Sequence, residues 1–320
     1  MELRQTMNKH VVNGLLLEKV ATYGSKDGKD YLSVELSIET TDGTYVTRSY
    51  QRKLTKDGKE NPMYKSLDTV AREYKAVKNT IIPDGANRNV ANVELTDREQ
   101  ADYVSVEVEF SPRDYMSKRG NLVEAINYRG NKINRISKED TRYPIGFKGN
   151  FEGCVTAIEK EKDYNGVETG RLNAQIVGIN YGGKAVPLVV AIDADIAEGF
   201  LQTYSVGQTA MFSIKTITVT KGAAEPTPQI EKAGWGRADE EEVHFNSGFT
   251  VVEYNCFNGG MPYAQGSPEE LPPALVTQAL QERQLELQTL KANAQSQVAP
   301  NGNSGIQMNP TPIAPQDLPF

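Results

Sequence analysis

The sequence predicts an all-β protein, built mainly of strands with a few short helices. Two observations carry this expectation. Short runs in which apolar and polar residues alternate are separated by turn residues, and one order of elements occurs twice along the chain. With 320 residues, the chain is also long enough for two ordinary domains and an extension. We therefore expect a first domain at 1–136, a linker at 137–146, a second domain at 147–263, a helical extension at 264–294 and a disordered tail at 295–320.

The first unit is predicted to begin with an apolar-rich strand over 11–23, which closes at a turn rich in Gly, Ser and Asp. Residues 32–39 then alternate strictly between apolar and polar side chains, and this period of two marks a strand with one buried face. After Thr41-Asp42-Gly43 the chain returns as a strand over 44–54, which completes a hairpin.

The second part of this unit switches to a helical period and then back to strands. Apolar residues recur at helical spacing over 63–79, which predicts an amphipathic helix. After a connection rich in Pro, Gly and Asn, alternation resumes over 104–110, and a basic turn leads into a fifth strand at 122–136.

The second unit repeats the order of the first. We expect strands at 147–160, 172–180, 185–192, 209–221 and 245–257, and a short helix near 196–204 with Asp193 or Asp195 as its cap. Three strands, a helix and two strands is the order of the OB-fold, a five-stranded barrel that binds oligonucleotides on its central strands and two of its loops.

The C-terminal part changes character. Val276, Leu280, Leu287 and Leu290 predict a helix over 269–294 with a coiled-coil-like stripe that Arg283 interrupts. We expect this helix to dock on a barrel, and self-association into a homo-oligomer is the alternative. Residues 295–314 are too polar to form a core and are expected to be disordered.

Charge and cysteine content narrow the function class. The net charge is −7, but residues 1–150 carry 25 basic and 22 acidic side chains, whereas residues 151–320 carry 10 and 20. Local potential guides a polyanion more than total charge does. The two cysteines cannot form a disulfide framework, and no apolar run is long enough to span a bilayer. We expect a soluble protein of a reducing cytoplasm, without a membrane partner.

Basic and aromatic residues suited to single-stranded nucleic acid gather in the first unit, where cations would contact phosphates and rings would stack on bases. Arg48, Tyr50 and Arg52 share one strand face by alternation. The full set of nucleic-acid candidates is Arg48, Tyr50, Arg52, Lys53, Lys56, Arg113, Tyr115, Lys118, Arg119, Tyr128 and Arg129, with Trp235 from the second unit. Packing of the tyrosines into the core is the alternative for each ring.

Signals for catalysis are weak. Gly178 and Gly183-Lys184 resemble a phosphate-binding loop, but Ala185 stands where a Ser or Thr must bind magnesium, and a hairpin turn explains the pattern better. His10 and His244 are far apart and lack a cysteine pattern, so no zinc site is expected. We therefore predict no catalytic residues, no metal and no cofactor.

The last four residues, Asp317, Leu318, Pro319 and Phe320, form a candidate partner-binding tip. Phe320 offers a ring and an α-carboxylate on one residue, which a pocket beside an Arg or Lys could hold together.

The element order and this ending resemble the single-stranded-DNA-binding proteins of bacteria and phages, the SSB family. The stretch from Tyr103 to Arg135 is similar to that family's fourth strand, basic loop and fifth strand. The chain departs from the family in having two barrels, no Trp in the first barrel and a single Asp in the tip. Two barrels per chain suggest a tandem, phage-type relative.

The resemblance implies a non-enzymatic, sequence-tolerant binder of single-stranded DNA in replication or recombination, which recruits replication or recombination proteins through its tip. Two alternatives remain. One is a phage structural or scaffold protein whose β-domains bind protein, and the other is a nucleic-acid-processing enzyme.

Overall fold

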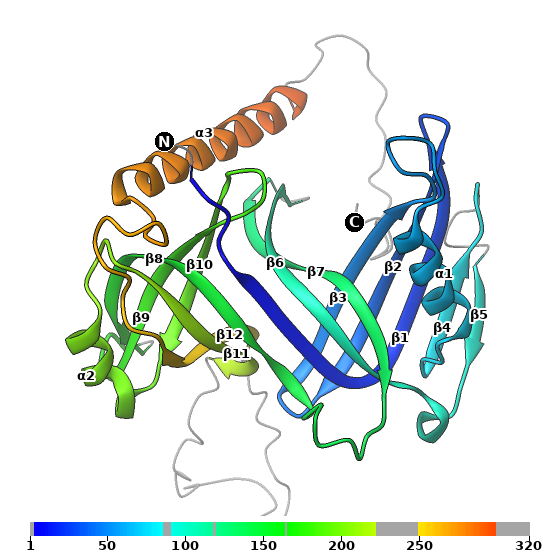
Figure 1. Ribbon diagram of the computed structural model, residues 1–320, viewed down its shortest axis with the longest axis horizontal. Coiled ribbons are helices and arrows are strands. Elements are labelled where there is room, and N and C mark those ends of the chain that lie inside the picture. Colours follow the sequence, from blue (N-terminus) through cyan, green and yellow to red (C-terminus); the bar gives the residue numbers. More distant parts are fainter. Residues whose placement is uncertain (1–2, 86–90, 118–119, 164, 222–248, 299–320) are drawn as a thin grey trace, which may run out of the picture.

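A computed structural model describes residues 3–85, 91–117, 120–163, 165–221 and 249–298 (Figure 1). The strands are β1 (Asn8–Lys26), β2 (Lys29–Thr40), β3 (Gly43–Arg52), β4 (Lys78–Ile82), β5 (Asn92–Leu95), β6 (Tyr103–Met116), β7 (Leu122–Ile136), β8 (Gly146–Lys162), β9 (Glu168–Ile179), β10 (Ala185–Ile192), β11 (Thr209–Lys221) and β12 (Phe249–Gly259). The helices are α1 (Pro62–Glu73), α2 (Ala194–Thr203) and α3 (Pro273–Val298). The predicted all-β class is confirmed.

The first five long strands close on themselves in what we call circuit 1, formed by β1, β2, β3, β7 and β6. Antiparallel pairs join β1 to β2, β2 to β3, β7 to β6 and β6 to β1, and a short parallel pairing of β3 with β7 closes the ring. In chain order this is the sequence one, two, three, five, four, with α1 following the third strand, as in the OB-fold.

Circuit 2, formed by β8, β9, β10, β12 and β11, repeats the same order. Its antiparallel pairs join β8 to β9, β9 to β10, β12 to β11 and β11 to β8, and β10 meets β12 in parallel at Ala191 and Asn255. Helix α2 again follows the third strand of the ring. The predicted repeat of element order is therefore present in the strand pairing.

One strand joins the two circuits. Residues 8–13 of β1 pair with residues 146–151 of β8, residues 10–15 pair with β6, and residues 15–26 pair with β2. Figure 1 shows β1 running from circuit 2 into circuit 1. Because both rings contribute to one continuous cluster of buried apolar residues, including Phe110, Phe147 and Phe212, the circuits share a core.

Helix α1 is shorter than the sequence predicts. Asn61 caps its start, since its side-chain oxygen accepts a hydrogen bond from the Met63 N–H at 3.0 Å. The helix ends at Glu73 instead of residue 79. At this end of the helix the Nζ of buried Lys19 donates hydrogen bonds to the carbonyls of Val70 and Tyr74.

Beyond α1 the chain forms β4, which pairs in parallel with β1, and β5, which pairs with β4. Neither strand is predicted from the sequence, because Val77 extends the helical spacing and hides the change of period. This hairpin widens the sheet of circuit 1 on the β1 side.

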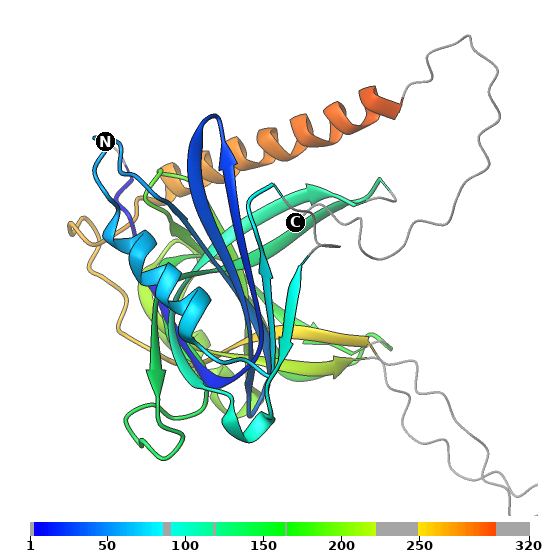
Figure 2. The same ribbon diagram turned by 90° about the vertical axis from the view of Figure 1, so that its right-hand side faces the viewer.

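Helix α3 docks on circuit 2. Val276 and Ala279 are buried with Val177, Ile179 and Ala185 in a second apolar cluster. This contact accounts for the first part of the apolar stripe, Val276 and Leu280, so docking on a barrel, the expected arrangement, is confirmed. Figure 2 shows that the helix continues beyond circuit 2 alongside the β6–β7 hairpin.

Candidate nucleic-acid interface

The outer face of β3 presents the residues that the alternation predicts. Tyr45 and Thr47 are buried inside circuit 1, so Arg48 and Tyr50 point outward. Half of the Tyr50 surface is exposed (50%), and Arg52 is exposed at the end of the strand. The strand therefore offers a ring and two guanidinium groups to a ligand lying along its outer side.

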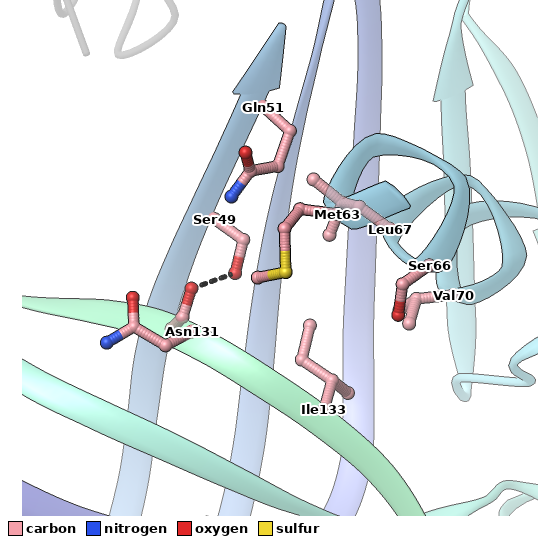
Figure 3. Close-up of a pocket in the computed structure, with 9 residues that line it drawn as sticks. Ser49, Gln51, Met63, Ser66, Leu67, Val70, Asn131 and Ile133 are labelled. Carbon is pink, nitrogen blue, oxygen red and sulfur yellow. Dashed lines mark hydrogen bonds between the residues drawn. The ribbon is translucent and has the colours of Figure 1, made fainter. Parts of the chain in front are cut away.

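The inner side of the same strand leaves no room for a ligand. Ser49 and Gln51 face Met63 and Leu67 beneath α1 (Figure 3). Ser49 Oγ donates a hydrogen bond to the carbonyl of Gly130 at 2.7 Å. The space between them is about 20 Å³, which holds about one water molecule. Binding to β3 is therefore confined to the outer face.

Tyr50 is one half of an aromatic pair that the sequence analysis missed. The ring of Tyr31, on β2, lies 5.2 Å from the Tyr50 ring, centroid to centroid, with 31° between their planes. Gly24 on β1 makes room for this ring, since a Cβ at that position would lie 2.5 Å from the Tyr31 hydroxyl oxygen. Three adjacent strands thus build a small aromatic platform, of the kind on which bases stack.

Three cations of circuit 1 have no carboxylate partner among the described residues, and one of them, Arg52, is directly opposite Tyr31. In the part of the chain that the structure describes, no acidic group lies within ion-pair distance of Arg52, Lys56 or Arg129. Lys53 pairs with Asp30 at 3.2 Å, but both side chains are largely exposed, and such pairs contribute little. The platform therefore has cations available for phosphates.

Arg48 occupies the seam between β3 and β7. Its Nε lies 3.4 Å from a carboxylate oxygen of Glu35, and its Nη1 donates to Asn127 at 3.3 Å. The parallel register places Arg48 beside Arg129. Glu35 partly offsets the charge of Arg48, so Arg129 is the less compensated cation of this seam.

The β6–β7 hairpin continues the same face. Directly opposed residues of an antiparallel pair share a face, and Glu109–Arg129, Ser111–Asn127, Arg113–Ala125 and Tyr115–Val123 are such pairs. Tyr115 is exposed, and the Arg113 guanidinium carbon lies 5.6 Å from the centre of its ring. The register therefore places Arg113, Tyr115 and Arg129 on one surface with Arg48. We call the outward residues Tyr31, Arg48, Tyr50, Arg52, Arg113, Tyr115 and Arg129 the outer face of circuit 1.

The prediction that Tyr128 stacks on bases needs correction. Its side chain is buried, with 8% exposure, and its ring lies 5.4 Å from Phe110 and 5.0 Å from Phe147. Its hydroxyl bonds the Tyr254 hydroxyl at 3.0 Å, and burial raises its pKa far above the ordinary value. Tyr128 is a core residue where the two circuits meet.

Several predicted residues lie outside the described part of the chain. These are Lys118, Arg119, Trp235 and the four tip residues Asp317, Leu318, Pro319 and Phe320.

The corresponding surface of circuit 2 has a different character. Helix α3 covers Val177 and Ile179 on β9. The uncovered part is a groove of about 340 Å³ whose lining includes Pro187, Val189 and Val252. Two lysines of this circuit form ion pairs, Lys184 with Glu286 at 2.6 Å and Lys215 with Asp42 at 2.7 Å.

A second groove lies between the circuits next to Arg129. It measures about 220 Å³, and its lining includes Asn8, Glu109 and Tyr181. Tyr181, in the β9–β10 turn, is almost fully exposed (92%). The groove links the outer face of circuit 1 with a ring from circuit 2.

Other kinds of site are not evident among the described residues. No group of three or more His, Cys, Asp or Glu side chains in this part of the chain is arranged to hold a metal ion. None of the described helices is long and apolar enough to cross a membrane. Cys154 and Cys256 are free and buried, and burial raises the pKa of each thiol to about 11.

The fold and the outer face of circuit 1 together define a class of protein. It is an all-β protein with OB-like strand order and a basic, aromatic outer face. Within that class the chain belongs to the YorF family, whose profile matches residues 8–293. No curated protein matches the sequence.

Among solved structures, a deletion mutant of the single-stranded DNA binding protein from Thermus aquaticus is similar, with a TM-score of 0.47 and 9% identity over 83% of this chain and 99% of that chain. The wild-type protein from the same organism has a TM-score of 0.46 and 8% identity, over 82% of this chain and 97% of that chain. A Replication Protein A heterotrimer bound to ssDNA has a TM-score of 0.20 and 12% identity, over 66% of this chain and 45% of that chain. At these scores the likeness is too distant to bear on function.

Proposed function

We propose that this protein binds single-stranded DNA, without sequence preference and without catalysis, on the outer face of circuit 1. The observation that carries the proposal is the Tyr31–Tyr50 platform beside Arg52, a cation without a carboxylate partner in the described part of the chain. Unpaired bases would stack on the rings while phosphates contact the cations. A duplex hides its base faces and would bind less tightly.

The proposal divides the chain into two OB domains, 1–136 and 147–263, with 137–146 between them. Circuit 1 supplies the affinity, and the apolar surface of circuit 2 contributes little. The DNA strand would cross β3 and continue along the β6–β7 hairpin. These are the parts of an OB-fold that usually contact oligonucleotides.

The test is a fluorescence anisotropy titration of a dT oligomer with the full chain. Tyr50→Ala should weaken binding roughly 5- to 150-fold, the effect of removing one stacked base. Arg52→Ala should lower the salt dependence by about 0.7 in the log–log slope, as expected for one lost phosphate contact on a single strand.

A matched control uses an exposed Arg–Tyr pair that is not part of the outer face of circuit 1. The Arg142 side chain, between β7 and β8, is 80% exposed, and its guanidinium carbon lies 5.8 Å from the centre of the Tyr143 ring. Replacing Arg142 and Tyr143 by Ala should leave affinity unchanged. Equal affinity for dT oligomer and duplex, or equal losses in the two pairs of variants, would reject the proposal.

The biological role that we propose is coating of single strands during DNA replication or recombination, in a bacterial or phage-infected cytoplasm. The residues Asp317–Phe320 would recruit a partner protein, with the Phe320 ring as the group that an apolar pocket of the partner holds. Deleting these four residues should leave dT affinity unchanged or raise it, because an anionic end competes for the cations. Pull-downs from host lysate that do not differ between the two forms would contradict the recruitment role.

A further inference from the structure

Helix α3 contains one arginine in the middle of its buried stripe. Val276, Ala279 and Leu287 are buried at helical spacing, and Arg283 lies on the same side of the helix. Although Arg283 interrupts the apolar pattern, its side chain is only 11% exposed. Such burial of a guanidinium requires a partner.

The partners of Arg283 are two carboxylates on the β6–β7 hairpin. Both of its terminal nitrogens bond Asp114, one of them to Oδ1 at 2.9 Å, and Nη2 also donates to Glu124 Oε2 at 3.1 Å. Asp114 and Glu124 are directly opposed across the hairpin. Two like charges in that position repel each other, so one cation bridging both stabilises the hairpin.

The acidic and the basic side chains of the hairpin lie on its two opposite faces. Asp114 and Glu124 project toward α3, whereas their strand neighbours Arg113 and Tyr115 project to the outer face of circuit 1. Figure 2 shows α3 running alongside this hairpin. The helix thus binds the acidic face of the hairpin and leaves the face with Arg113 and Tyr115 uncovered.

We propose that Arg283 is a positioning residue for nucleic-acid binding, which holds the β6–β7 hairpin against α3 so that Arg113 and Tyr115 contact the bound strand. This inference rests on the proposed function. It also assigns the C-terminal helix a part in DNA affinity that does not depend on contact between the helix and DNA. Without Arg283 the two carboxylates are uncompensated beside the strand, and the hairpin is less ordered.

The test compares Arg283→Gln with Lys291→Gln in the full chain. Lys291 lies two turns further along α3, is exposed, and forms no ion pair among the described residues, so its replacement makes the same charge change. Two quantities are measured: amide hydrogen exchange of residues 111–127, and the Kd for a dT oligomer. In Arg283→Gln we expect exchange in the hairpin to accelerate and Kd to rise by about tenfold. Lys291→Gln should match the wild type in both.

A rescue variant separates positioning from general destabilisation. Asp114→Asn with Glu124→Gln, added to Arg283→Gln, removes the uncompensated charges and should restore Kd to within about threefold of wild type. If the loss of affinity came only from general destabilisation of the chain, it would persist in this variant.

Each negative result has a distinct meaning. Hairpin exchange that is equal in Arg283→Gln and Lys291→Gln would overturn the positioning role. Faster exchange with an unchanged Kd would show that the hairpin does not contribute to binding, while binding through Tyr50 stands. A wild-type chain that does not bind dT oligomer at all would reject the proposed function itself.

Discussion

Burial of His10 should make the stability of the protein depend on pH. The residue lies on β1 at the junction of the circuits and is fully buried. Its ring stacks on Phe110 at 3.7 Å, and the rings of Phe147 and Phe151 are each 6.4 Å away. Neither ring nitrogen has a hydrogen-bond partner among the described residues. Burial lowers the pKa of His10 to about 3.

The sign of the effect follows from proton binding in the two states. The unfolded chain takes up a proton at His10 near pH 6.5, whereas the folded protein stays unprotonated down to about pH 3. The folded state is therefore favoured fully above pH 6.5 and loses stability as the pH falls below it. Between pH 7.5 and pH 5 the free energy of unfolding should drop by about 2 kcal/mol from this group alone.

The measurement is urea unfolding followed by far-ultraviolet circular dichroism at pH 7.5, 6 and 5, a range above the ordinary pKa of carboxylates. His10→Leu, an apolar side chain of similar size, should remove most of the 2 kcal/mol drop, an order-of-magnitude figure. His244→Gln replaces the only other histidine and serves as the control. A pH dependence that survives in His10→Leu and disappears in His244→Gln would show that His10 is not the group responsible.

Two further predictions concern the joint between the circuits. Gly149→Ala should destabilise the protein by more than about 2 kcal/mol, because its Cβ would lie 2.3 Å from the His10 Cα, whereas Gly199→Ala, in open space within α2, should stabilise it by roughly 0.5–1 kcal/mol. Thermal unfolding of both variants checks this, and equal shifts would contradict it. Arg4→Ala leaves the largely buried carboxylate of Glu152 without its 2.6 Å partner and should cost about 1–3 kcal/mol in urea unfolding. Arg142 forms an exposed ion pair, and Arg142→Ala is the control. An equal loss of unfolding free energy in Arg4→Ala and Arg142→Ala would show that burial of Glu152 has no role.

The barrel strands could be predicted because their periods are local. The alternation over 32–39 and the run over 185–192 both give strands at the expected places, β2 and β10. β4 could not be predicted in this way, since its five residues gain their strand partner only when the chain returns to β1. Parallel pairing with a distant segment leaves no local signature.

The candidate site was predicted in part. Tyr128 and Arg129 are neighbours in one strand, so both side chains cannot point to the same face, and the alternation could have excluded Tyr128. The same rule could have found Tyr31, which has the parity of the outward residues Ser33 and Glu35. The partners of Arg283 could not be inferred, because only the folded chain places α3 beside the hairpin.

The long strand β1 fixes the geometry of the whole molecule. Tandem barrels joined only by a flexible loop can pivot and change their spacing. Here residues 8–13 of β1 are paired with β8 of circuit 2, and residues 10–26 of the same strand are paired with β6 and β2 of circuit 1. Neither circuit can therefore turn relative to the other without breaking main-chain hydrogen bonds. A ligand long enough to contact both circuits would therefore meet two surfaces whose spacing and relative orientation are fixed.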